Sequence, residues 1–214
     1  LKPPKSSFLL ESNSSILNEI NKIILNSKTK SESITFKMKL GIETDINEKN
    51  LLKKILKELP ENTKLRLDVN GSWTYEQAKS WVKFLKNESK IEWLEQPLPA
   101  QEIQGLKQLA KDIPIALDES LIQQPDLIKT WPSWQIRRPL LEGDPRILLE
   151  ELKEGVSYRV LTTTFETGIG RRWINHLAAL QQATPTPTAP GLAPGWYPNS
   201  PLFSSNPREV WEAL

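Results

Sequence analysis

Short apolar or alternating runs recur along the chain, and between them lie longer segments whose apolar residues are three or four positions apart. The first pattern is typical of strands and the second of amphipathic helices, and their regular alternation indicates parallel strands joined by helical crossovers. We expect strands at 7–10, 35–40, 64–68, 91–95, 115–118, 134–138 and 158–162, with a weak eighth at 186–189. We expect helices at 16–25, 48–59, 75–85, 103–110, 146–153 and 173–182.

Eight strands spaced about 25 residues apart suit one (β/α)8 barrel, which takes roughly 200 to 250 residues. A doubly wound open sheet is the alternative, and the barrel is favoured because no short Gly-rich phosphate-binding loop is present. We therefore predict an α/β fold, a TIM-type (β/α)8 barrel over residues 1–189. Residues 190–214 begin with Pro- and Gly-rich sequence and are expected to form coil and a short helix packed on the barrel.

Composition excludes several kinds of site. The 28 Lys and Arg residues against 26 Asp and Glu give a net charge of +2, with no dense basic cluster, so nucleic acid is not an expected partner. The chain has no Cys, so any metal must bind to oxygen ligands. No apolar run reaches the roughly 20 residues that span a bilayer, and we expect a cytoplasmic protein without a membrane partner. The one histidine, His176, lies in a predicted helix and is expected to pack rather than to catalyse.

Three carboxylates end three successive predicted strands: Asp68, Glu95 and Asp118. In a barrel, these strand ends converge on the active-site face. Like charges placed there repel one another unless a cation neutralises them, and oxygen ligands suit Mg²⁺. Each acid alone could simply cap a helix or begin a turn. Their common register favours a Mg²⁺ site, and strand alternation places Asp118 rather than Glu119 on the inner face.

Cationic and polar residues accompany these acids. Lys37 and Lys39 share one face of the second strand, where a metal and the neighbouring amine are expected to lower a lysine pKa towards that of a base. The alternative is a solvated edge strand. Arg138, on the sixth strand, is expected to stand across the barrel from the lysines, and Arg66 and Asn70, on the face of Asp68, are candidate substrate contacts.

Several motifs stand in a specific order along nearly the whole chain: Lys37-Met-Lys39, residues 65–70 with Trp73-Thr74, 93–97, 116–120, 162–166 with Gly170, and 190–192. In this order they resemble the o-succinylbenzoate synthase family of the enolase superfamily. The resemblance implies that Asp68, Glu95 and Asp118 bind Mg²⁺ and that Lys39 removes the proton α to a carboxylate. It further implies that Lys37 adds positive charge beside the enediolate. Thr162, Thr164 and Gly191 fall at substrate contacts, Gly191 through its backbone N–H.

The implied reaction is syn dehydration of 2-succinyl-6-hydroxy-2,4-cyclohexadiene-1-carboxylate, a small-molecule carboxylate, to o-succinylbenzoate in menaquinone or phylloquinone biosynthesis. Arg138 departs from the family pattern, which has Lys there; Arg can stabilise negative charge but is a poor acid or base. The family also carries an N-terminal α+β capping domain that is missing from this chain and that we expect in the complete protein. The alternatives are a cycloisomerase or dipeptide epimerase of the same superfamily, and a catalytically silent barrel with a binding or structural role.

Overall fold

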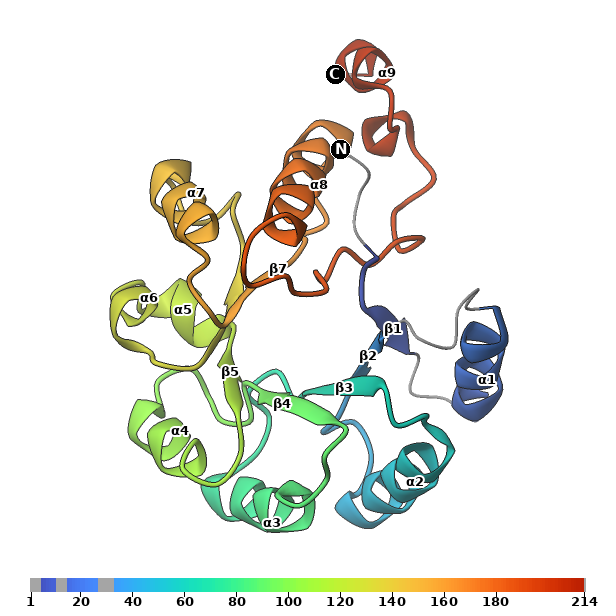
Figure 1. Ribbon diagram of the computed structural model, residues 1–214, viewed down its shortest axis with the longest axis vertical. Coiled ribbons are helices and arrows are strands. Elements are labelled where there is room, and N and C mark those ends of the chain that lie inside the picture. The colour runs from blue at the N-terminus through green and yellow to red at the C-terminus, as the bar shows by residue number, and fades with distance from the viewer. Residues whose placement is uncertain (1–4, 11–14, 27–32, 214) are drawn as a thin grey trace. The chain divides into compact units, whose positions relative to one another are not determined.

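The structure is a computed structural model that describes residues 5–10, 15–26 and 33–213. The chain divides into two compact units. The first unit is Phe8–Trp134, and the second is Gln135–Leu214 together with the N-terminal segment that ends at Ser7. Figure 1 labels the helices and strands of both units, and each unit is described by itself.

The first unit is built on parallel strands that pair in the order in which they occur in the sequence. They are β1 (Phe8–Leu10), β2 (Ile34–Lys39), β3 (Thr63–Asp68), β4 (Ile91–Glu95) and β5 (Ile115–Leu117). The connecting helices are α1 (Ile16–Asn26), α2 (Asp45–Glu58), α3 (Tyr75–Leu85) and α4 (Ile103–Leu109), and α5 (Glu119–Gln123) and α6 (Leu127–Thr130) follow β5. This arrangement confirms the predicted alternation of strands and crossover helices.

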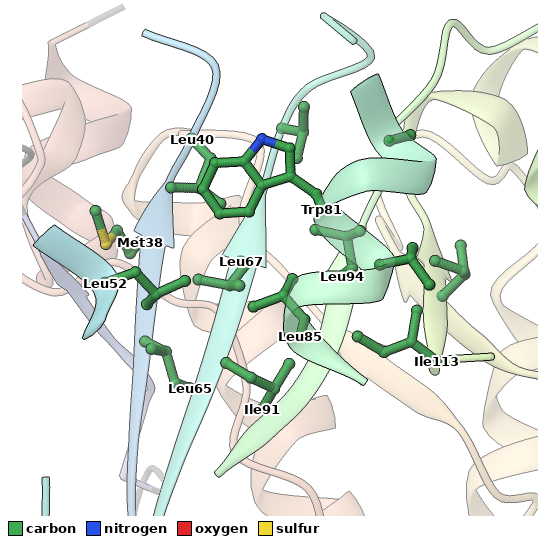
Figure 2. Packing of buried hydrophobic residues seen from close by; sticks show 14 of the residues in the cluster. Met38, Leu40, Leu52, Leu65, Leu67, Trp81, Leu85, Ile91, Leu94 and Ile113 are labelled. Atoms are coloured by element: carbon green, nitrogen blue, oxygen red, sulfur yellow. The ribbon is translucent and has the colours of Figure 1, made fainter. Parts of the chain in front are cut away.

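One face of this sheet packs against the helices. Leu65 and Leu67 of β3 are fully buried and lie among apolar residues of α2 and α3, including Leu52 and Trp81 (Figure 2). Successive side chains on a strand point to opposite faces, so Arg66, which lies between these leucines, points away from the helices. The alternation that builds the core therefore places the charged residues of the strands on the opposite face.

The second unit contains β6 (Trp134–Arg137), which begins at the unit boundary, and β7 (Arg159–Leu161), paired in parallel. Its helices are α7 (Pro145–Glu154), α8 (Gly168–Gln182), the 3-10 turn η1 (Pro201–Phe203) and α9 (Pro207–Glu212). A small core forms from residues of α7, β7 and α8 with Leu192. The N-terminal segment joins this unit through Ser6, whose hydroxyl donates to the carbonyl of Pro190 at 2.9 Å.

Buried ion pairs hold β6 and β7 to α7. The guanidinium of Arg137 is 2% exposed and pairs with the carboxylates of Glu142 and Glu151. Arg159 of β7 also contacts Glu151, with 3.0 Å between Nη2 and Oε1. Burial and these two arginines act in opposite directions on the pKa of Glu151, and the arginines prevail, so that pKa is lowered. Glu151 therefore stays ionised and ties the two strands to the helix.

The predicted eighth strand at 186–189 is wrong: these residues are described and form no strand. Pro185, Pro187 and Pro190 remove backbone donors at and around this segment, which prevents a regular ladder. In its place Gly191 makes a single parallel bridge to Thr162. The division after residue 189 stays a prediction. Among the described residues, none of the helices has the length and apolar character needed to cross a membrane.

Candidate metal and base site

Three carboxylates lie at the C-terminal ends of neighbouring strands in the first unit. Asp68 ends β3 and pairs in register with Glu95, which ends β4. Asp118 directly follows β5. The exposed fractions of Asp68, Glu95 and Asp118 are only 3%, 1% and 1%. Burial of an ionised carboxylate is costly unless it is paired or neutralised, so this arrangement requires positive charge close by.

Lys37 supplies part of that charge. Its Nζ lies 2.8 Å from Oδ2 of Asp68 and 2.6 Å from Oε1 of Glu95, so the two carboxylates are held against one ammonium group. Burial lowers the pKa of Lys37, but the charges and hydrogen bonds of Glu95 and Asp68 outweigh burial and raise that pKa above the usual lysine value. The expected lowering of the pKa is therefore wrong for Lys37 in the metal-free protein, where its ammonium group contacts both carboxylates.

The positive charge of Lys37 does not fully compensate the carboxylates. Burial and the charges of Asp68 and Asp118 raise the pKa of Glu95 to about 7, although Lys37 opposes the shift. In the described part of the chain, no three Asp, Glu or His side chains are arranged to hold a metal ion as they stand. The oxygen donors and the shortage of positive charge nevertheless fit a hard divalent cation such as Mg²⁺.

The second lysine of β2 lies at the exposed rim of this site. The Nζ of Lys39 donates to Oδ1 of Asn70 at 3.0 Å, and Nδ2 of Asn70 donates to Oε1 of Glu119 at 3.0 Å. Asn70 has a φ of 50°, and its backbone N–H donates to Oδ1 of Asp68 at 3.2 Å. Asn70 therefore connects Lys39 to the carboxylate layer, which is formed by Asp68, Glu95 and Asp118. The link to Glu119 depends on this left-handed turn and has no signal in the sequence.

Arg66 does not lie where a substrate contact is expected. Its side chain is buried, its Nε is 2.7 Å from Oε2 of Glu92, and its guanidinium stacks 4.1 Å from the ring centroid of Trp93. The ring of Trp93 also packs against Trp134. The Nε1 of Trp93 donates to Oε2 of Glu95 at 3.2 Å. Arg66 thus supports the layer of side chains next to Glu95, and a group this buried is poorly placed to contact a substrate.

A buried acid holds the loop that follows β2. The carboxylate of Glu48, on α2, accepts hydrogen bonds from the backbone N–H groups of Gly41, Ile42 and Glu43 at 3.0, 2.9 and 3.1 Å. The side chain of Ile42 is 63% exposed. The loop beyond Lys39 is therefore fixed through its backbone, and nothing in the sequence distinguishes Glu48 from the solvated acids of the same helix.

The remaining predicted residues lie in the second unit. Thr162 and Gly191 are brought together: the hydroxyl of Thr162 donates to the Gly191 carbonyl at 3.0 Å. The N–H of Gly191 donates to the carbonyl of Leu161 at 2.8 Å. The expected contact of this N–H with a substrate carboxylate is therefore not supported. A Cβ at Gly191 would lie 2.8 Å from Oγ1 of Thr162, which explains the glycine by close approach.

Thr164 and Arg138 belong to loops that follow β7 and β6. The hydroxyl of Thr164 donates to Oε2 of Glu166 at 3.1 Å. The backbone N–H of Arg138 donates to Oε1 of Glu142 at 2.7 Å, and its Nη1 donates to the Thr163 carbonyl at 3.4 Å. Each loop is thus held by hydrogen bonds to a glutamate further along the chain, Glu166 for Thr164 and Glu142 for Arg138.

Known proteins are similar to this chain in sequence and in fold. A family model described as enolase C-terminal domain-like matches residues 30–130. A crystal structure of o-succinylbenzoate synthase from Thermosynechococcus elongatus BP-1, with Mg in its active site, has a TM-score of 0.81 and 31% sequence identity, and the alignment covers 100% of this chain and 68% of that one. The chain belongs to the enolase superfamily. This membership confirms the expected resemblance and identifies the chain as a C-terminal barrel domain of that superfamily.

Relatives within the enolase superfamily differ in activity. The o-succinylbenzoate synthase of Thermosynechococcus vestitus is 34% identical over 192 residues, which are 84% of this chain and 59% of that protein. A chloromuconate cycloisomerase of Pseudomonas sp. (strain P51) is 33% identical over 88 residues, which are 40% of this chain and 24% of that protein. The chain therefore spans little more than half the length of the synthase it matches, and the synthase match extends over more of the chain.

Proposed function

We propose that the chain is the barrel part of an o-succinylbenzoate synthase, which dehydrates 2-succinyl-6-hydroxy-2,4-cyclohexadiene-1-carboxylate in menaquinone or phylloquinone biosynthesis in the cytoplasm. The observation that carries the proposal is the layer formed by Asp68, Glu95 and Asp118 at three strand ends, with Lys37 and Lys39 on the same face of the adjoining strand. The 34% identity to a synthase over 192 residues supports the same reaction.

Lys39 is the proposed base. Its amine is exposed, and Oδ1 of Asn70 at 3.0 Å orients it. The amine takes the proton from the carbon α to the substrate carboxylate, and the resulting ammonium returns a proton to the hydroxyl group on the same face of the ring. The C–O bond then breaks, water leaves, and the ring becomes aromatic. One lysine is sufficient because both proton transfers occur on one face.

The negative charge that develops on the substrate carboxylate needs stabilisation. Lys37 provides a fixed ammonium group among the carboxylates. Mg²⁺ bound by Asp68, Glu95 and Asp118 would supply Lewis-acid stabilisation of that charge. Asn70, Thr162 and Thr164 stay predicted substrate contacts. Arg138 stays a predicted catalytic residue that would contribute charge and no proton transfer.

The direct test is an assay of the chain with the proposed substrate. We expect a Mg²⁺-dependent change in absorbance as the aromatic product forms, with loss of activity in EDTA and in Lys39→Met. Lys57→Met, on the last turn of α2, is the matched control and should retain activity. Because the chain spans 59% of the synthase it matches, the complete protein is assayed in parallel. Failure of both to turn over the substrate with Mg²⁺ would overturn the proposal.

A cycloisomerase is the second candidate, because the chain is also 33% identical to a chloromuconate cycloisomerase over 88 residues. Supplying cis,cis-muconate in place of the first substrate separates the two. Turnover of muconate alone would favour the cycloisomerase. A chain that shows no turnover and whose stability does not respond to Mg²⁺ would favour a catalytically silent barrel, the role that Arg138 in place of lysine suggests.

A further inference from the structure

Gln96 directly follows Glu95 and has an unusual backbone. Its φ is 38°, in the left-handed region, and the residue is 0% exposed. For a residue other than glycine, this conformation is energetically unfavourable and persists only where the surroundings determine it. The contacts of the side chain show what this conformation achieves.

The amide group of Gln96 uses all of its hydrogen-bonding capacity inside the fold. Its Oε1 accepts from the backbone N–H groups of Asp118 and Ser120, at 3.1 and 3.2 Å. Its Nε2 donates to Oγ of Ser120 at 2.8 Å and to the carbonyl of Leu98 at 2.9 Å. An amide oxygen accepts two hydrogen bonds and an NH₂ group donates two, so the group is fully satisfied.

The backbone of Gln96 extends the same connections. Its N–H donates to the carbonyl of Ala116, in β5, at 2.9 Å. Its carbonyl accepts from the N–H of Gly71, in the turn after β3, at 2.7 Å. Gln96 therefore makes hydrogen bonds to the turn after β3, to β5, and to the residues that directly follow β5.

Asp118 is one of the residues that these contacts reach. The strand β5 ends at Leu117, and it pairs with β4 through Leu94 with Ile115 and Glu95 with Ala116. Asp118 lies beyond the strand with φ −121° and ψ −81°, values of neither a strand nor a helix. Its N–H is held by the Gln96 side chain.

We propose that Gln96 is a positioning residue that sets Asp118 relative to Glu95 and thereby controls the affinity of the carboxylate layer for a divalent cation. The left-handed backbone turns the amide from the end of β4 towards the start of α5, where its oxygen accepts from the backbone N–H groups of Asp118 and Ser120. The part of this inference that concerns the cation rests on the proposed function, whereas the part that concerns Asp118 rests on the hydrogen bonds alone.

Substitutions at Gln96 and at a second buried glutamine test the proposal. Gln96→Leu removes every side-chain hydrogen bond, and Gln96→Glu keeps an oxygen that accepts from Asp118 and Ser120. Gln181→Leu is the control, because Gln181 is 1% exposed and its Nε2 donates to the Arg159 carbonyl at 2.7 Å in the second unit. Mg²⁺ affinity is measured by calorimetry, and Mn²⁺ binding by electron paramagnetic resonance.

We expect Gln96→Leu to weaken Mg²⁺ binding by about 10- to 100-fold, as loss of a group that supports metal ligands does. Gln96→Glu should weaken it less, and Gln181→Leu should not change it even if the protein becomes less stable. Wild-type affinity in Gln96→Leu would overturn the role in cation binding. A loss of binding in Gln96→Glu as large as in Gln96→Leu would also overturn it, because the acceptor oxygen remains.

Amide hydrogen exchange, measured without metal, separates this inference from the proposed function. Exchange of the Asp118 and Ser120 amides should accelerate in Gln96→Leu and stay slow in Gln96→Glu and Gln181→Leu. If the wild-type chain binds no Mg²⁺, the proposed function fails, and the exchange rates still decide whether Gln96 positions Asp118. Unchanged exchange at both amides in Gln96→Leu, or rapid exchange in Gln96→Glu, would refute the positioning role.

Discussion

Replacing Glu95 by its neutral isostere should stabilise the metal-free protein at alkaline pH. Glu95 is buried, and burial, Asp68 and Asp118 raise its pKa from 4.5 to about 7 despite the opposing charge of Lys37. Because the folded-state pKa lies above the unfolded-state value, the protonated group contributes stability below pH 4.5, and this contribution is lost as the pH rises through about 7. Gln reproduces the uncharged form at every pH.

The size of the effect follows from the interval between the two pKa values. From 4.5 to about 7, at 1.36 kcal/mol for each pH unit, ionising Glu95 in the folded protein costs about 3 kcal/mol. Glu95→Gln should therefore be about 3 kcal/mol more stable than the wild type at pH 8 and equal to it at pH 4.5. Mg²⁺ at pH 8 should narrow this difference in stability, because it stabilises the wild type, which keeps Glu95 as a ligand. A ligand at 100 times its Kd stabilises the protein that binds it by about 2.7 kcal/mol.

Urea denaturation in EDTA measures the difference in the free energy of unfolding between Glu95→Gln and the wild type at pH 4.5 and at pH 8. The same measurement with Mg²⁺ at pH 8 shows whether the metal narrows that difference. The conservative control is Glu88→Gln, in the loop before β4, which should show neither the gain at pH 8 nor the response to Mg²⁺. A Glu95→Gln protein that is less stable than the wild type at pH 8 would refute the reasoning. The ion pair with Lys37 would then outweigh the cost of burial.

Substitutions at four further positions test other contacts. Lys39→Met should abolish turnover and leave Mg²⁺ affinity within about threefold, as measured by calorimetry; a loss of both would make Lys39 structural. Arg138→Lys should retain dehydration and Arg138→Ala should slow it, so an unchanged steady-state rate in Arg138→Ala would remove its electrostatic role. Gly191→Ala should cost about 1 to 3 kcal/mol in urea denaturation, because its Cβ would lie 2.8 Å from Oγ1 of Thr162, and a stable variant would show that the bridge can relax. Arg137→Met should cost about 3 kcal/mol, since it leaves Glu142 without an ion-pair partner in the described part of the chain and Glu151 with Arg159 alone, and an unchanged thermal midpoint would contradict this.

The alternation of side chains made the strands readable from the sequence. In β2, Phe36 and Met38 are buried against the helices, and Lys37 and Lys39 occupy the other face, as their spacing predicts. A period of two residues is a local property, so a single strand carries it without knowledge of its neighbours. The positions of the three strand-end carboxylates could be predicted for the same reason.

Properties that depend on distances between strands could not be predicted. The raised pKa of Lys37 results from contacts below 3 Å with two carboxylates that lie on two other strands. The backbone N–H of Gly191 was expected to contact a substrate. Only the bridge to β7 shows that this N–H donates to the carbonyl of Leu161. The role of Gln96 depends on a positive φ and on partners more than 20 residues away, and neither has a local signature.

The eighth strand is a different case, because the sequence did contain the contrary signal. Pro185, Pro187 and Pro190 lie at or beside the four residues assigned to it. Proline donates no backbone hydrogen bond and is confined to the edges of sheets. The structure accordingly has an isolated bridge between Thr162 and Gly191 after this segment, and no eighth strand among the described residues.

The contact between Glu48 and the loop after β2 has a practical consequence for protein engineering. Because a side chain on α2 holds three backbone N–H groups, the anchoring of the loop does not depend on which side chains occupy positions 42 and 43. Ile42 and Glu43 can therefore be randomised together while the loop keeps its path. A combinatorial library at these two positions, built with Glu48 retained, would vary the side chains of the loop that follows Lys39. The hydrogen bonds that anchor this loop would remain.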